Sequence, residues 1–153
     1  MKLREVQGDL FELDASEWPL AHCISADVTA KKYMDKGIAK LFRNKYLDMA
    51  KEIFPQLEVG KAVRYEKNGH VIYNLVPKHR VGQKAKGSYE EDYYRQLRES
   101  LEDVREEMTA RGETKLGMPR IASGLDGGDW DQIRQMIEDT FQGTEIEVQV
   151  RYL

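Results

Sequence analysis

The chain has 153 residues, a length that fits one domain with a substantial hydrophobic core. Apolar residues make up 41% of the chain and charged residues 33%, which excludes an intrinsically disordered protein. The net charge of −3 argues against a domain that grips a nucleic-acid backbone, because such domains usually carry a basic excess.

The expected compartment follows from what the sequence lacks. The one cysteine, Cys23, allows no intrachain disulfide and favours a reducing environment. The start MKLREVQGDLF is too polar for a signal peptide, and no apolar run approaches membrane-spanning length. We therefore expect an intracellular protein, cytoplasmic or nuclear, that does not contact membranes.

Strands and helices alternate along the chain. Hydrophobic periodicity predicts strands at residues 2–7, 19–25, 61–65, 70–76, 114–118 and 145–153, and helices at 37–54, 88–111 and 130–141. Asn68-Gly69 between two alternating segments predicts a hairpin, and Gly112 predicts the end of the second helix. The alternation predicts an α/β sandwich with a mixed sheet, formed by residues 1–153 as a single domain.

The segment MPRIASGLDGGDW, which starts at Met118, is the most informative stretch. A strand, a glycine-rich loop and a helix start in this order are typical of a phosphate cradle, because glycine lets the backbone approach an anion and free N–H groups point at it. Asp126 lies in the same loop. A carboxylate beside a phosphate is electrostatically unfavourable, so its presence there indicates another role, such as catalysis. The alternative is that Asp126 or Asp129 only caps the following helix.

In open α/β sheets, ligands bind at the carboxyl ends of the strands, which places together the loops after Ser25, Val76 and Met118. In the second loop, VPKHR, Pro77 stiffens the strand end and Lys78 follows at once. A desolvated lysine can attack carbonyl-like carbons, whereas a solvated one is only a counter-charge. Both interpretations of Lys78 stay open at this point.

Two histidines lie in or next to predicted strands. His22 is within an apolar strand, and we expect it to be a hydrogen-bonded core histidine. His79 follows Lys78 at a strand end and would face the other way, so we expect it on the surface.

Six segments together resemble the macrodomains, which are ADP-ribose-binding α/β/α modules, and most closely their terminal ADP-ribose protein glycohydrolase branch. They are GDLF at 8–11, LAHCIS at 20–25, GIAKLF at 37–42, YNLVPKHR at 73–80, MPRIASGLD at 118–126 and VRYL at 150–153. The resemblance extends over essentially the whole chain and implies a three-layer α/β/α macrodomain with a central mixed sheet.

The resemblance also implies roles for individual residues. Lys78 would attack C1″ of the distal ribose, and Asp126 would assist. Asp9 would accept a hydrogen bond from the adenine amino group. The rest of the implied ADP-ribose site comprises Leu10, Ser25, Gly37, Ile38, Ala39, Ser123, Gly124, Leu125 and Leu153. Among these, Ser25 and the backbone of residues 37–39 would line the ribose and diphosphate, and residues 123–125 would offer backbone N–H groups to the diphosphate.

The first loop departs from the family pattern. Small residues usually precede GIA, but here the segment is Met34-Asp35-Lys36-Gly37, and residues 29–33 look like extra loop length. Bulkier side chains there would narrow the distal-ribose pocket, which affects substrate preference more than ADP-ribose binding.

These features favour a hydrolase that removes mono-ADP-ribose from protein carboxylate esters, with deacylation of O-acetyl-ADP-ribose as a related activity. The alternatives are a non-catalytic ADP-ribose reader, an ADP-ribose-1″-phosphate phosphatase and an enzyme that removes ADP-ribose from nucleic acid. A reader needs neither Lys78 nor Asp126, and the histidine expected for the phosphatase is not evident in the first loop.

The expected partners are ADP-ribose and ADP-ribosylated protein, with nucleic acid only as a modified substrate. We expect a monomer. No His, Cys, Asp and Glu cluster has ligand spacing, so we expect no metal and no cofactor.

Overall fold

The computed structural model describes residues 1–29, 34 and 36–153. Most of the altered first loop, residues 30–33 and 35, lies outside the described residues. Within them, no helix is both long enough and apolar enough to cross a membrane.

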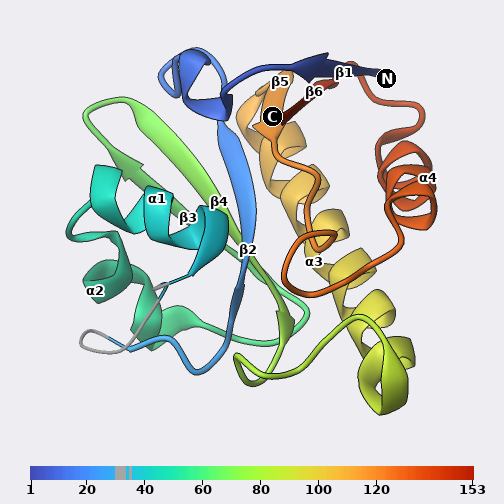
Figure 1. The fold of residues 1–153 in the computed structure, drawn as a ribbon. Coiled ribbons are helices and arrows are strands. Elements are labelled where there is room, and N and C mark those ends of the chain that lie inside the picture. Colours follow the sequence, from blue (N-terminus) through green and yellow to red (C-terminus); the bar gives the residue numbers. More distant parts are fainter. Residues whose placement is uncertain (30–33, 35) are drawn as a thin grey trace.

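Six strands form one sheet in the order β1-β6-β5-β2-β4-β3 (Figure 1). Their bounds are β1 Lys2–Gln7, β2 Leu20–Ser25, β3 Ala62–Lys67, β4 His70–Lys78, β5 Lys115–Met118 and β6 Glu147–Tyr152. All neighbouring strands run parallel except β3, which pairs antiparallel with β4 through the hairpin. The mixed sheet is therefore confirmed.

Helices cover both faces of the sheet. The helices α1 (Gly37–Lys45) and α2 (Met49–Ile53) lie on one face, and α3 (Glu90–Arg111) and α4 (Trp130–Phe141) lie on the other (Figure 1). Each helix pair encloses its own hydrophobic core against the sheet. Successive residues of a strand serve opposite cores, as Leu20 and Ala21 do, which explains why the central strands read as continuous apolar runs. The three-layer α/β/α fold is confirmed.

The hairpin turn and the helix end that the sequence predicts are also confirmed. Asn68 and Gly69 have φ angles of 53° and 81°, the pair of left-handed residues that a tight hairpin turn needs. Gly112 ends α3 with φ 71°, and its N–H donates to carbonyls of the last turn.

The single helix expected over residues 37–54 is wrong. The chain leaves the helix at Tyr46 and resumes only at Met49. This break places the Tyr46 hydroxyl 3.0 Å from Nδ1 of His70 and packs its ring edge-on against Tyr65. The tertiary contacts of Tyr46 thus interrupt a segment whose apolar periodicity predicts a continuous helix.

β4 is longer than expected, since Pro77 and Lys78 belong to the strand and not to the loop. The register explains how a central strand tolerates proline. Leu75 and Lys78 of β4 face Cys23 and Ser25 of β2, so β4 has one extra residue there. A bulge is one of the few places where a missing N–H does not break the ladder.

Candidate functional site

The loops that follow β2, β4 and β5 meet at the carboxyl edge of the sheet. The Ala26 N–H donates to the Lys78 carbonyl at 3.0 Å, and the Ala85 N–H donates to the Asp126 carbonyl at 2.9 Å. In Figure 1 the orange glycine loop faces the cyan α1 across the middle of the molecule. The expected convergence of three loops is confirmed.

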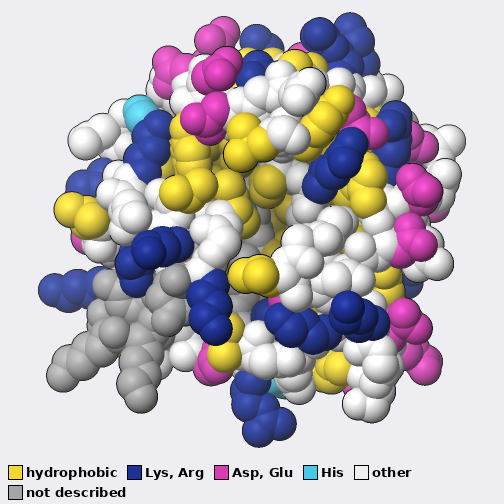
Figure 2. Space-filling model, viewed as in Figure 1, with side chains coloured by type: hydrophobic (Ala, Val, Ile, Leu, Met, Phe, Trp, Pro, Cys, Tyr) yellow, Lys and Arg dark blue, Asp and Glu magenta, His cyan; other side chains and the backbone are white. Residues whose placement is uncertain are grey.

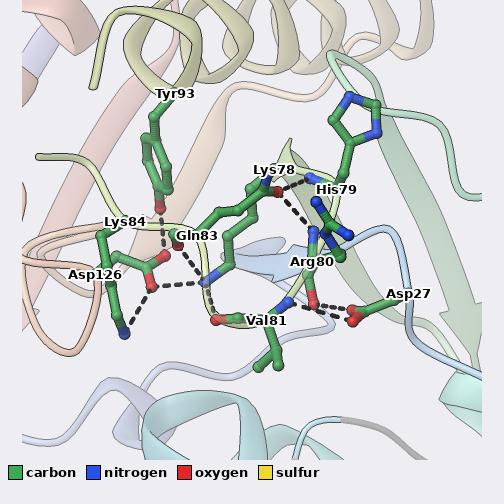
Figure 3. Close-up of polar contacts among 10 residues, drawn as sticks. Asp27, Lys78, His79, Arg80, Val81, Gln83, Lys84, Tyr93 and Asp126 are labelled. Carbon is green, nitrogen blue, oxygen red and sulfur yellow. Dashed lines mark hydrogen bonds and ion pairs between the residues drawn. The ribbon is translucent and has the colours of Figure 1, made fainter. Parts of the chain in front are cut away.

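Lys78 ends β4 with its side chain only 8% exposed. Its ammonium group has three acceptors: the carbonyls of Val81 (3.0 Å) and Gln83 (3.2 Å), and Oδ1 of Asp126 at 2.6 Å (Figure 3). Three donors and three acceptors match, so the ammonium is fully satisfied out of water. The alternative of a solvated cation is wrong.

Asp126 receives hydrogen bonds on both carboxylate oxygens. Oδ1 accepts from Lys78, and Oδ2 accepts from the hydroxyl of Tyr93, which reaches down from α3 (Figure 3). Burial, with added repulsion from nearby acidic groups, raises the pKa of the Tyr93 phenol far above its ordinary value. Tyr93 therefore stays protonated and fixes the orientation of the carboxylate.

The two roles suggested for acids of the glycine loop belong to different residues. Asp129 is the N-cap of α4, where its side chain accepts from the N–H groups of Asp131 and Gln132. Asp126 is committed to Lys78 and Tyr93 instead. The capping interpretation therefore holds for Asp129 and not for Asp126.

Cys23 is another nucleophilic group close to this pair. Burial raises the pKa of the Cys23 thiol well above its ordinary value, and the Asp126 carboxylate raises it further. A thiol held in its neutral form is a poor nucleophile, so Cys23 is a weaker candidate than Lys78.

The glycines of the third loop differ in what they do. A Cβ on Gly128 would lie 2.7 Å from the Ala122 carbonyl oxygen, and Gly127 has φ 69°, so both are required by the loop itself. A Cβ on Gly124 would meet nothing within 4 Å, so its side faces open space. Gly124 is thus the glycine where a ligand could approach.

The three residues expected to offer N–H groups to a diphosphate lie together in this loop. The Ser123 N–H donates to the Arg120 carbonyl at 3.3 Å, so it is already engaged in a turn. Leu125 is 63% exposed, and its Cδ1 lies 3.3 Å from where a Cβ of Gly37 would be. Leu125 of the glycine loop therefore packs against the start of α1.

The residues expected on the α1 side lie opposite. Gly37 starts α1 with φ 60°, and Ile38 and Ala39 are partly buried against the core between α1 and the sheet. Ser25 is buried at the end of β2, where its hydroxyl donates to Oδ1 of Asp27 at 2.5 Å.

The remaining expected residues follow the paired strands β1 and β6. Asp9 lies directly after β1, beyond Gly8, and is exposed. Its carboxylate caps the short 3-10 turn Leu10–Glu12 by accepting from the Phe11 N–H at 2.9 Å. Leu10 is buried, so only its backbone is available to a ligand, whereas Leu153 is 93% exposed.

Sequence reasoning misses three residues of this site. The helical pattern places Tyr93 only on an apolar face, although a buried tyrosine hydroxyl needs a partner and so signals a polar contact. Asp27 accepts from Ser25 and, at 3.3 Å, from the Val81 N–H, which ties the first loop to the second. Lys84 lies 3.8 Å from Oδ1 of Asp126, and no local pattern points to it.

The histidines lie as expected. His22 is fully buried, and its Nε2 is 2.7 Å from Oδ1 of Asn74. His79 is exposed. In the part of the chain that the structure describes, no group of three His, Cys, Asp or Glu side chains could hold a metal ion.

Comparisons with known proteins agree with this architecture. No family model matches the chain. It is 34% identical over 149 residues to the ADP-ribose glycohydrolase OARD1 of Homo sapiens and to that of Bos taurus, covering 97% of this chain and 90% of each relative.

Solved structures share the fold at lower identity. The macrodomain of Thermus aquaticus DarG superposes with a TM-score of 0.81 at 20% identity, covering 99% of this chain and 98% of that one. Thermosipho africanus DarTG in complex with ADP-ribose gives 0.78 at 19% identity, covering 98% of this chain and 41% of that one. With this fold, and with a third of its residues identical to OARD1 along nearly its whole length, the chain belongs to the macrodomain family, beside the OARD1 glycohydrolases.

Proposed function

We propose that the protein is a hydrolase that removes mono-ADP-ribose from carboxylate esters on proteins. The observation that carries the proposal is the buried contact of 2.6 Å between Nζ of Lys78 and Oδ1 of Asp126, at the edge of the sheet where ligands of such folds bind. The relatives named ADP-ribose glycohydrolase support the same class of reaction.

Lys78 would be the nucleophile. An ammonium has no free electron pair, so Lys78 must first lose a proton, and Asp126 is the carboxylate in contact with it. The neutral amine then bonds to C1″ of the distal ribose, which is still joined to the ester oxygen. The bond from C1″ to the ester oxygen breaks, and the protein carboxylate leaves with the electron pair.

Asp126 would serve the second stage as well. Water adds to C1″ of the lysyl adduct, the bond between C1″ and Nζ breaks, and the proton returns to the amine from Asp126. ADP-ribose and the original ion pair are regenerated, and the other proton of the water is released to solvent. The Tyr93 hydroxyl holds the other oxygen of Asp126, so Oδ1 faces Lys78 throughout.

Binding alone does not account for this arrangement. Removing two charges from water is costly, and a reader of ADP-ribose gains nothing from an ion pair whose side chains are 8% and 14% exposed. Strongly desolvated charge pairs are typical of catalytic sites. The rest of the site, from Asp9 to Leu153, would bind ADP-ribose, with the protein acting as a monomeric single domain.

The test is Lys78→Ala. It should abolish cleavage of an ADP-ribosyl-glutamate peptide while ADP-ribose affinity, measured by calorimetry, stays within about tenfold, or about 1.4 kcal/mol. Borohydride added during turnover should trap ADP-ribose on the peptide that contains Lys78. Full activity of the variant would refute the lysine mechanism, and a wild-type protein that binds but cleaves no linkage would be a reader.

A further inference from the structure

A second lysine reaches the proposed catalytic carboxylate from the solvent side. Nζ of Lys84 lies 3.8 Å from Oδ1 of Asp126, and its side chain is 41% exposed, compared with 8% for Lys78. Figure 3 shows the two lysines approaching Asp126 from different directions. Lys84 therefore places an exposed cation beside the buried ion pair of Lys78 and Asp126.

Further cations lie along the same segment. The end of the Lys86 side chain covers the glycine loop, since a Cβ on Gly127 would lie 2.9 Å from its Nζ. Arg80 is exposed one residue before Val81, which is tied to Asp27. Residues 79–89, HRVGQKAKGSY, contain no aspartate or glutamate, and we call them the basic loop.

Two acidic groups near the basic loop have partners of their own. Asp126 is paired with Lys78, and Asp27 is held by Ser25 and Val81. The next carboxylates along the chain are those of residues 90–92, which begin α3. Although the whole chain has a net charge of −3, Figure 2 shows Lys and Arg side chains gathered over the lower part of this face.

We propose that the basic loop binds acidic residues that flank the ADP-ribosylated carboxylate of a protein substrate. This inference rests on the proposed ester hydrolase. The acids at the start of α3 limit the basic surface, which suits a short acidic peptide better than a long phosphate backbone. Tyr89 of the basic loop is half-buried and its hydroxyl donates to Gln96, so its ring offers no open platform for a base.

The experiment compares two peptides with the same ADP-ribosylated glutamate, flanked either by Glu and Asp or by Gln and Asn. Wild-type protein should show a several-fold higher kcat/KM for the acidic peptide, and the difference should shrink as salt rises, because exposed ion pairs are weak and screened. Lys84→Gln/Lys86→Gln should bring the ratio between the peptides close to one. The charge-matched control Lys2→Gln/Lys115→Gln, on other parts of the surface, should keep the preference.

Equal kcat/KM for both peptides in the wild type, or an unchanged ratio in the double variant, would overturn the proposal. The proposal would also be overturned if the double variant lost only the cleavage of an ADP-ribosylated oligonucleotide and cleaved both peptides as the wild type does. If neither peptide is cleaved, the hydrolase proposal fails, and calorimetric binding of the two peptides still decides whether the basic loop prefers acidic flanks.

Discussion

Lys78 and Asp126 carry opposite charges at a place that water barely reaches, so their geometry depends on the groups that hold them. Two carbonyls of the adjoining loop hold the ammonium, and the Tyr93 hydroxyl holds the far oxygen of the carboxylate. In the proposed mechanism, Asp126 would therefore take a proton from Lys78 without first reorienting.

Tyr93→Phe tests this positioning. The change removes one hydroxyl from a fully buried ring and leaves Lys78 beside Asp126. Because a hydrogen bond to a charged group contributes about 1.5–3 kcal/mol, kcat should fall about tenfold or more while KM changes little.

Tyr94→Phe is the matched control, because the Tyr94 hydroxyl accepts from the Asp129 N–H and does not bind Asp126. It should keep the wild-type kcat. A Tyr93→Phe enzyme with unchanged kcat would show that the hydroxyl only fills space.

At the scale of elements, we expect some glycines of the glycine loop to affect ligand binding and others to affect the stability of the fold. Gly124→Val should leave the fold intact, since a Cβ there has open space, but should weaken ADP-ribose binding at least about tenfold by blocking close approach of a diphosphate. Gly128→Val should instead lower the melting temperature, because its Cβ would lie 2.7 Å from the Ala122 carbonyl oxygen. Thermal unfolding and calorimetry distinguish the two, and normal binding by a folded Gly124→Val protein would contradict the phosphate assignment.

Most elements could be predicted from sequence because their signals are local. The hairpin at Asn68-Gly69, the cap at Gly112 and the span of α4 depend on neighbouring residues, and all three are confirmed. The break after α1 could not be predicted, since it depends on contacts between Tyr46 and residues of the hairpin far along the chain.

The candidate site also has a part that local sequence signals predict and a part that they do not. The position of Lys78 at a strand end follows from an alternating pattern, and the position of Asp126 follows from a glycine-rich loop. Their contact with each other, and that with Tyr93, joins residues 33 to 48 positions apart and so has no local signature. The roles assigned to the ADP-ribose-binding residues remain predictions.

At the scale of the whole molecule, one polar network lies inside the core that joins α1 and α2 to the sheet. His22 stacks on Phe42 at 4.0 Å between ring centroids, and its Nε2 lies 2.7 Å from Oδ1 of Asn74. The Asn74 amide donates to the Val63 carbonyl, so its oxygen must accept from His22. Nε2 of His22 therefore carries a proton, and burial favours the neutral form of the ring.

This histidine should make the fold sensitive to acid. Burial lowers the pKa of His22 from 6.5 to about 4, so the unfolded chain binds the proton more tightly than the folded one. The free energy of unfolding should be unaffected by His22 above pH 6.5 and should fall as the pH drops from 6.5 towards 4, by about 3 kcal/mol in total. His22→Gln should flatten this slope in urea unfolding between about pH 7.5 and 4.5, whereas His79→Gln, at an exposed position, should retain it. Equal slopes for wild type and His22→Gln would mean that acid sensitivity arises elsewhere in the molecule.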